Sequence, residues 1–323
     1  MLDPLSDVLQ SIRLQGAVFY FVECVEPWAA EAPPAAEIAA ALMPGAQHVF
    51  EFHAVTSGRC WAGPIGAQPI RLEEGDFVAF PQGDPHVVSS APGMRAPPDP
   101  AIFARQEGQQ LPYPVTYGSG HGARAGLVCG FLGCDARPFN PLLATLPRVL
   151  HASRRDGVDW LSRFIDLAVA ESRERRPGGD SVLSRVSELL FVEVVRRHLE
   201  ALPQGETGWF AGLRDEFVGK AIERLHGRPA APWTLDLLAR EVGLSRSALA
   251  ERFTRLVGEP PMHYLARWRM QLASARLASG GANVQAVAAE VGYASKAAFS
   301  RAFKKIVGAP PATWGRRHDL PRS

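Results

Sequence analysis

The pattern of hydrophobic and polar residues changes character near Asn140. Before that point, short runs rich in β-branched and aromatic residues alternate with turns built from Gly and Pro. Short strands at close spacing, with turn residues between them, favour an antiparallel sandwich or a small barrel. We expect Ala91–Pro114, rich in Pro and Gln, to form a loop or a weak edge. The predicted strands are Val18–Val22, His48–Val55, Gln68–Leu72, Asp76–Phe80 and Gly126–Leu132.

After Asn140, apolar residues recur every three to four positions, which is typical of helices packed on one face. This spacing predicts helices at Pro141–His151, Val158–Arg175 and Ser181–Leu199, with Leu202–Gly212 as a linker. The third helix carries a wide apolar stripe that must be buried. The protein's own barrel and a dimer interface are both suitable partners, and the sequence favours neither.

The last hundred residues contain two similar segments, Leu238–Ser245 and Val287–Ser295. Each has the pattern of a helix, a short turn and a second helix, with Gly243 or Gly292 where a positive φ is suited to glycine. This is the pattern of a helix-turn-helix motif, whose second helix can enter a major groove. The uninterrupted helix predicted at Met262–Ser279 would span about 27 Å and hold the two motifs apart.

Charge is unevenly distributed along the chain, although the net charge is only +2. Residues 1–140 hold 7 arginines against 14 acidic residues, residues 141–211 are balanced, and residues 212–323 hold 18 basic against 9 acidic residues. A basic C-terminal part suggests a polyanionic partner. The 46% of hydrophobic residues excludes global disorder.

Apolar runs, the N-terminal segment and the cysteine content indicate the cellular compartment of the protein. No apolar run approaches the ~20 residues that span a bilayer, and the beginning of the chain does not resemble a secretory signal. Four cysteines are too few for a disulfide framework in a chain of 323 residues. We therefore expect a cytoplasmic protein with no membrane partner.

Residues from about 214 to 318 resemble the DNA-binding domain of the AraC/XylS family of bacterial transcription regulators. The resemblance covers both motifs, the connecting helix and the closing Gly308–Trp314, where Trp314 stands in place of the family's Tyr or Phe. It implies a regulator, with activation as the commoner mode, whose N-terminal domain senses a small molecule or dimerises. The implied partners are double-stranded DNA, a second copy of the chain, an unidentified effector and, for an activator, RNA polymerase.

Carried over position by position, the resemblance also implies which side chains contact DNA. Only Arg301 has a fork that can bind guanine through two hydrogen bonds, while Glu251 can accept one from cytosine. For any single residue the alternative is ordinary solvated surface. The base-facing residues would be Ser247, Ala250, Glu251, Ala297, Ser300 and Arg301, and the phosphate-facing residues would be Arg246, Arg255, Lys296, Lys304 and Lys305.

The segment Gly75–His86 resembles the second sequence motif of cupins, and Ser90 stands where that motif often has Asn. Glu51 matches the glutamate of the first cupin motif, but the usual His-x-His before it is missing. This resemblance implies a jelly-roll sensor. Strand alternation places Glu51 and His53 on one face, where they would meet His86 in an effector pocket.

A transition metal would accept the imidazoles and the carboxylate of this pocket, and Cys129 offers a thiolate. The alternative is that His86 is a hydrogen-bonded turn residue and His53 a pocket wall. No cofactor is therefore assigned, and a metal ion in the barrel stays open.

Together these patterns predict an α+β protein with two domains. The first is a cupin-like sensor β-barrel over residues 1–140, and the second is a double helix-turn-helix domain over 212–323. A helical dimerisation or linker region over 141–211 connects them. The predicted function is sequence-specific DNA binding by a transcription regulator that is not an enzyme. One alternative is a metal-dependent cupin enzyme fused to a DNA-binding domain. Another is a constitutive regulator whose barrel only dimerises.

Overall fold

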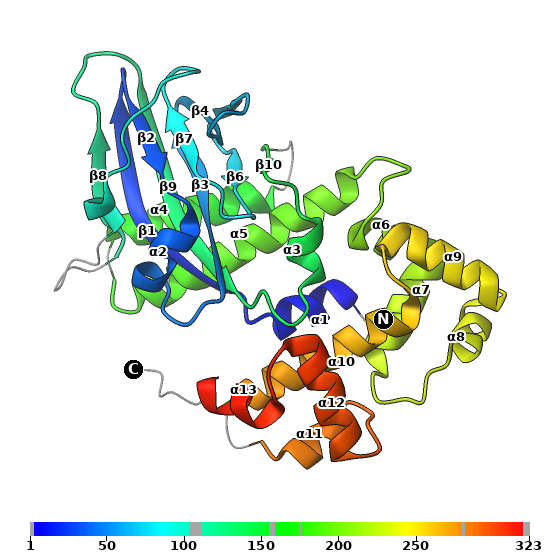
Figure 1. Cartoon of the computed structure of the whole chain (residues 1–323). Helices are drawn as coiled ribbons and strands as arrows, with labels where there is room; N and C mark the ends of the chain where they lie inside the picture. The colour runs from blue at the N-terminus through cyan, green and yellow to red at the C-terminus, as the bar shows by residue number, and fades with distance from the viewer. Residues whose placement is uncertain (1–2, 104–110, 155–158, 175, 280–281, 319–323) are drawn as a thin grey trace. The chain divides into compact units, whose positions relative to one another are not determined.

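The computed structural model describes residues 3–103, 111–154, 159–174, 176–279 and 282–318 (Figure 1). The chain forms two compact units. A sheet unit comprises Leu14–Cys134 and Leu146–Ala201, and a helical unit comprises the segment up to Arg13, Asp135–Thr145 and the chain from Leu202 onward. The helical unit therefore includes the segment up to Arg13 and Asp135–Thr145. The domain boundaries predicted at residues 140 and 211 place both segments outside the C-terminal domain.

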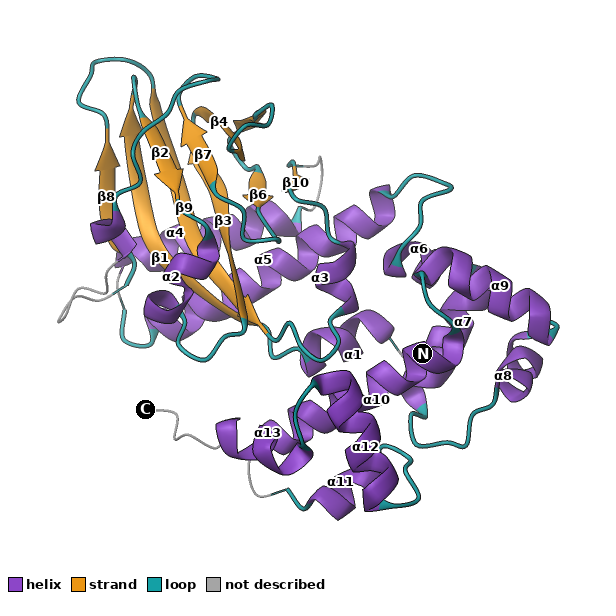
Figure 2. Cartoon of the chain, viewed as in Figure 1, coloured by secondary structure: helices purple, strands orange, loops and turns teal. Residues whose placement is uncertain are grey.

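The sheet unit contains two β-sheets (Figure 2). The larger has the order β10-β6-β3-β9-β1-β8, and its pairs are antiparallel except for the parallel pair β1–β8. The smaller has the order β2-β7-β4-β5 and is antiparallel. The strands are β1 (Gln15–Val25), β2 (Ala29–Ala32), β3 (His48–Ser57), β4 (Arg59–Pro64), β5 (Ile70–Glu73), β6 (Phe77–Ala79), β7 (His86–Ser89), β8 (Tyr113–Tyr117), β9 (Arg124–Cys134) and β10 (Leu150–Ala152).

Neither sheet closes on itself among the described residues, so of the predicted alternatives, a sandwich or a small barrel, the two open sheets fit the sandwich. An apolar core lies between them and includes Tyr20 and Phe131 from the larger sheet and Val88 from the smaller. All five predicted strands are present. The predicted loop at 91–114 contains a short 3-10 helix, η1 (Pro100–Phe103), and the beginning of β8, while residues 104–110 lie outside the described part of the chain.

The helices α4 (Trp160–Glu174) and α5 (Gly179–Ala201) cover the larger sheet on its other face. The ring of Phe191 on α5 packs 5.2 Å from that of Phe50 on β3. Close contact with β1 requires a glycine at position 16, because a Cβ there would lie 2.7 Å from the Cβ of Ser187. Most of the apolar stripe of α5 is therefore buried on the protein's own sheet, while Val182 and Leu189 stay exposed.

Two expectations about the connecting segments are wrong. The helix predicted over Pro141–His151 ends as α3 (Pro141–Thr145), because Leu150–Ala152 pairs with β6 at the edge of the larger sheet. The predicted linker Leu202–Gly212 contains the start of α6 (Trp209–Arg214). The indole of Trp209 is buried and donates a hydrogen bond to the Tyr264 hydroxyl at 2.8 Å, which makes this segment part of the core. The predicted helix ends Val158 and Arg175 lie outside the described residues.

The helical unit is built around α10, whose buried Gln271 joins segments distant in sequence. Its side-chain amide donates to the carbonyl of Ser11 at 2.9 Å and accepts from the backbone N–H of Phe139 at 3.1 Å. The remaining helices are α1 (Pro4–Ser11), α7 (Glu216–Gly227), α8 (Leu235–Val242), α9 (Arg246–Val257), α10 (Pro261–Ala278), α11 (Val284–Glu290), α12 (Lys296–Val307) and α13 (Pro311–His318), with α2 (Ala35–Leu42) in the sheet unit.

No helix within the described residues is both long and apolar enough to cross a lipid bilayer.

Candidate functional site

The helix pairs α8–α9 and α11–α12 repeat the same local chemistry. Gly243 and Gly292 adopt φ values of 80° and 81°, as the sequence predicted. Ser245 caps α9 by accepting a hydrogen bond from the N–H of Ala248 at 3.2 Å, and Ser295 caps α12 in the same way. A side chain at Gly292 would also lie 2.6 Å from the carbonyl oxygen of Ala230. The two turns therefore share a glycine with positive φ and a serine that caps the following helix.

The second helix of each pair has one buried and one exposed face. Leu249 and Phe253 are fully buried on α9, as Phe299 and Phe303 are on α12. All eleven residues predicted to contact DNA lie away from these core residues. Ala250 and Ser300 are half-buried, and the others are exposed: Arg246, Ser247, Glu251, Arg255, Lys296, Ala297, Arg301, Lys304 and Lys305.

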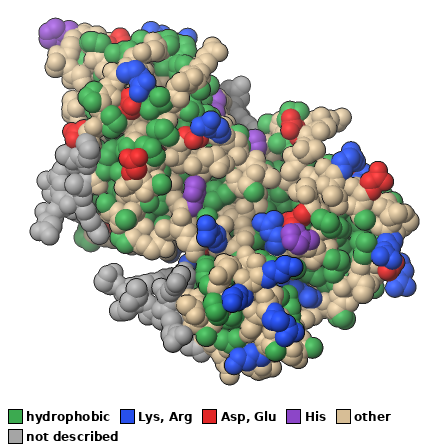
Figure 3. Space-filling model, viewed as in Figure 1, with side chains coloured by type: hydrophobic (Ala, Val, Ile, Leu, Met, Phe, Trp, Pro, Cys, Tyr) green, Lys and Arg blue, Asp and Glu red, His purple; other side chains and the backbone are tan. Residues whose placement is uncertain are grey.

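Basic residues on these helices divide into paired and unpaired groups. Arg252 forms an ion pair with Asp215 at 2.7 Å and stacks over the ring of Phe217, so it stabilises the fold. Among the residues that the structure describes, no acidic side chain pairs with Arg301 or Lys304. Lys and Arg side chains also gather over the C-terminal helices in Figure 3. Unpaired cations on one exposed face suit a phosphate backbone.

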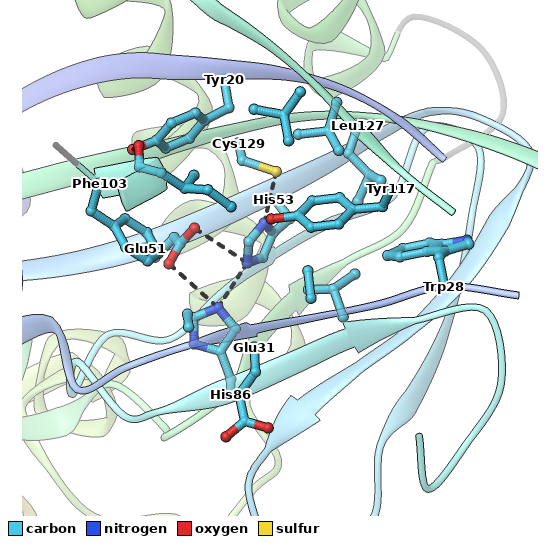
Figure 4. Close-up of a pocket in the computed structure, with 16 residues that line it drawn as sticks. Tyr20, Trp28, Glu31, Glu51, His53, His86, Phe103, Tyr117, Leu127 and Cys129 are labelled. Carbon is cyan, nitrogen blue, oxygen red and sulfur yellow. Dashed lines mark hydrogen bonds and ion pairs between the residues drawn. The ribbon is translucent and has the colours of Figure 1, made fainter. Parts of the chain in front are cut away.

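A second candidate site lies in the sheet unit, where side chains from both sheets surround a cavity of about 50 Å³ (Figure 4). Its walls are mainly aromatic and aliphatic, and include Tyr20, Trp28, Phe103, Tyr117 and Leu127. No sequence pattern identified these wall residues, which come from separate strands, from η1 and, for Trp28, from the position before β2. The one local signal was the alternation of β1, which turns Tyr20 and Val22 to the same side.

Four polar side chains meet in this pocket, and all of them were predicted from the sequence. The Nε2 atoms of His53 and His86 lie 2.8 Å apart. The Glu51 carboxylate lies 3.9 Å from Nε2 of His53 and 3.7 Å from Nε2 of His86. Cys129, directly across the strand pair from His53, places its Sγ 2.9 Å from Nδ1 of that ring. Cys129 therefore lies behind His53, at the nitrogen that points away from the other two residues.

Burial governs the protonation of this cluster. It raises the pKa of Glu51 to about 8 and lowers that of His86 to about 4. It also lowers the pKa of His53 and raises that of the Cys129 thiol, well away from their ordinary values. Without a bound cation, the neutral form of each group is favoured because charge is poorly solvated between the sheets.

Comparisons with known proteins place both halves of the chain. A family model described as Cupin matches residues 3–200, and one described as Helix-turn-helix domain matches residues 238–317. A putative AraC-like transcription regulator of Streptomyces lividans is 31% identical over 99% of this chain and 100% of its own length. The chain belongs to the AraC family of transcription regulators.

Two further relatives of this AraC-family protein extend along nearly the whole chain. A putative AraC-like transcription regulator of Streptomyces antibioticus is 32% identical over 99% of this chain and 100% of its own. The regulator AlkR of Acinetobacter baylyi is 28% identical over 94% of this chain and 96% of its own. The AraC-family protein is thus a DNA-binding transcription regulator with a cupin N-terminal part, and these relatives support a regulator and not an enzyme.

Proposed function

We propose that this AraC-family regulator reads double-stranded DNA through two helix-turn-helix motifs, α8–α9 and α11–α12. The observation that carries the proposal is the repeated turn, cap and exposed second helix in both pairs. The helix between them, α10, has 18 residues and therefore a length of about 27 Å. A spacer of that order suits two major grooves on one face of the duplex, whose repeat is ~34 Å.

The exposed side chains divide by chemistry into two roles. Arg301 is the one base-facing residue that can bind guanine through two hydrogen bonds, and Glu251 can accept from cytosine. Ser247 and Ser300 offer single hydroxyls, and Ala250 and Ala297 offer methyl contacts. The phosphate-facing residues fix the position of the protein on DNA without reading its sequence: Arg246, Arg255, Lys296, Lys304 and Lys305.

The same proposal includes a homodimer formed through α4 and α5. Although the main stripe of α5 is buried on the sheet, four large apolar side chains stay exposed on these two helices: Trp160, Leu167, Val182 and Leu189. Large apolar side chains exposed on two helices that pack against each other are candidates for an interaction surface. A dimer would double the number of DNA-reading helices, and it would act in the cytoplasm, where bacterial DNA lies.

In this proposal the pocket between the sheets holds a small effector that shifts the regulator between two DNA-binding arrangements. The cavity of about 50 Å³ favours an effector of only a few atoms. Activation through RNA polymerase is the mode that the family resemblance favours. A sheet unit that only dimerises is the second candidate, and the bulky apolar walls of the pocket support it.

The salt dependence of binding tests the assigned DNA surface. Each phosphate contact contributes about −0.9 to the slope of log K against log[salt]. We expect Lys304→Ala to reduce the magnitude of that slope by about 1 on any duplex, measured by fluorescence anisotropy of the full-length protein. Lys220→Ala is the matched control, because Lys220 pairs with Glu216 on α7, outside the proposed surface. Equal slopes for the Lys304 variant and the wild type would remove α12 from the DNA interface.

A further inference from the structure

The polar cluster in the sheet unit has the donors of a metal site. Glu51 and His53 come from β3 of the larger sheet and His86 from β7 of the smaller, and one ligand atom from each lies within 4.8 Å of the others. All three side chains are buried. Figure 4 shows the two imidazole edges and the carboxylate turned toward a common point beside the cavity.

Hydrogen bonds at the far side of each ring orient the histidines. Nδ1 of His86 donates to the backbone carbonyl of Asp84 at 2.9 Å, which leaves Nε2 of that ring with a free lone pair. Nδ1 of His53 contacts the thiol of Cys129, so its Nε2 likewise points toward His86 and Glu51. Metal-binding histidines are commonly held in this way, with one nitrogen on an acceptor and the other on the ion.

Glu51 shows why a cation suits the cluster better than a proton. A proton between the two Nε2 atoms satisfies both imidazoles but leaves the carboxylate without a hydrogen bond. The two Nε2 atoms, at 3.7 and 3.9 Å, lie beyond hydrogen-bonding distance of it, and no other described residue bonds to it. A buried carboxyl group without a hydrogen bond is costly whether or not it is protonated. A divalent ion would satisfy all three side chains together.

The distances also fit an ion. Tetrahedral ligands about 2.0–2.1 Å from a metal lie roughly 3.3–3.4 Å apart, and the observed separations of 2.8, 3.7 and 3.9 Å lie on both sides of that value. We propose that Glu51, His53 and His86 bind one divalent first-row transition-metal ion, with Cys129 as a positioning residue for His53. His53 then replaces the histidines missing from the first cupin motif.

Three protein ligands leave at least one coordination position open. In this cluster it faces the cavity of about 50 Å³, which has room for a few molecules of the size of water. The ion would therefore bind a small exogenous ligand, and that complex would be the effector of the pocket. The metal site itself does not depend on the DNA-binding proposal, since its test needs no DNA.

The experiment uses full-length protein without a histidine tag, purified without chelators and analysed for bound metals by mass spectrometry. The metal-free protein is then titrated with Co²⁺, whose visible absorption reports its ligands. We expect about one ion per chain, and a spectrum without a thiolate charge-transfer band, because Cys129 lies behind His53. Glu51→Gln and His86→Gln should weaken Co²⁺ binding more than about 100-fold, beyond the loss caused by removing an outer partner.

His48→Gln is the matched control, because His48 lies on the same strand but bonds to the carbonyl of Pro81. It should bind metal like the wild type. Thermal unfolding of every variant, with and without Co²⁺, identifies any that does not fold, and Co²⁺ should raise the melting temperature of the wild type and His48→Gln only. Absence of metal together with absence of Co²⁺ binding would overturn the proposal, as would unchanged binding by folded Glu51→Gln and His86→Gln. A thiolate charge-transfer band would overturn the assigned ligand set.

Discussion

Glu51, His53 and His86 show how far single residues could be predicted. Motif spacing and strand alternation named all three, and the structure brings them together. The same reasoning offered Cys129 as a fourth donor at the same point, but its Sγ meets the opposite nitrogen of His53. Alternation fixes which face a side chain occupies, whereas its place on that face depends on the pairing of β3 with β9, which spacing does not give.

Arg301 and Glu251 occupy equivalent positions in the two helix pairs and carry opposite charges. We expect Arg301→Ala to weaken binding to the preferred site by about 10- to 100-fold, because a bidentate contact with guanine contributes about 1–3 kcal/mol. Anisotropy titrations on duplexes that differ at single base pairs measure this effect. The preference should relax at one guanine only, and an equal loss on all sequences would make Arg301 a phosphate contact instead.

His226 makes the stability of the helical unit depend on pH. Its ring is buried, stacks 3.9 Å from that of Trp268 and places Nε2 2.8 Å from the Tyr264 hydroxyl. Burial lowers the pKa of His226, and Asp7 opposes this only in part. The unfolded chain therefore binds the proton more tightly, so stability is fully present above the unfolded pKa of ~6.5 and falls as the pH drops below it.

Thermal unfolding between pH 7 and pH 5 measures this effect. We expect the melting temperature of the helical unit to fall with pH in the wild type and to fall less in His226→Gln. His121→Gln, which alters an exposed loop histidine, should behave like the wild type. If the wild type and His226→Gln lose the same stability over this range, protonation of other groups accounts for the loss.

At the scale of elements, strands and helices with a strong local pattern were predicted well, and edge elements were not. The periodicity of α4, α5, α9 and α12 and the β-rich runs of β1, β3 and β9 are properties of the segments themselves. In contrast, β10 is three residues long and is a strand only because Leu150 and Ala152 pair with β6. Pairing with a distant strand overrides local propensity, and a prediction made from neighbouring residues does not include that distant strand.

The helix α5 offers a direct test of the dimer. Leu189 is 46% exposed, while Leu190 and Phe191 beside it are fully buried. We expect Leu189→Glu to convert a dimer into a monomer in analytical ultracentrifugation, with little change in the melting temperature, because surface substitutions usually shift stability by less than about 0.5 kcal/mol. Ser181→Glu, which adds the same charge at an exposed position of α5, should leave the dimer intact. A wild type that sediments as a monomer at all concentrations would contradict the proposed interface.

At the scale of the whole molecule, segments far apart in the sequence fold into one unit. Gln271 bonds to Ser11 and to Phe139, which are 260 and 132 residues away along the chain. Arg13 and Asp135 add an ion pair of 2.6 Å between the same two segments. These contacts bring the first helix and Asp135–Thr145 into the unit that carries the proposed DNA-reading helices, which hydrophobic periodicity could not indicate. DNA-binding measurements therefore require the full-length chain, because a fragment of residues 212–323 lacks part of its own core.

Selection of binding sites from a pool of random duplexes with the full-length protein tests the central claim most directly. The two-motif account predicts enriched half-sites, one for each chain of the dimer, that each have two conserved blocks about one helical turn, ~10 base pairs, apart. Selection with Arg301→Ala should lose a guanine from one block and leave the other unchanged. A pool that stays random after repeated selection, despite retained protein-bound DNA, would contradict sequence-specific recognition by this regulator.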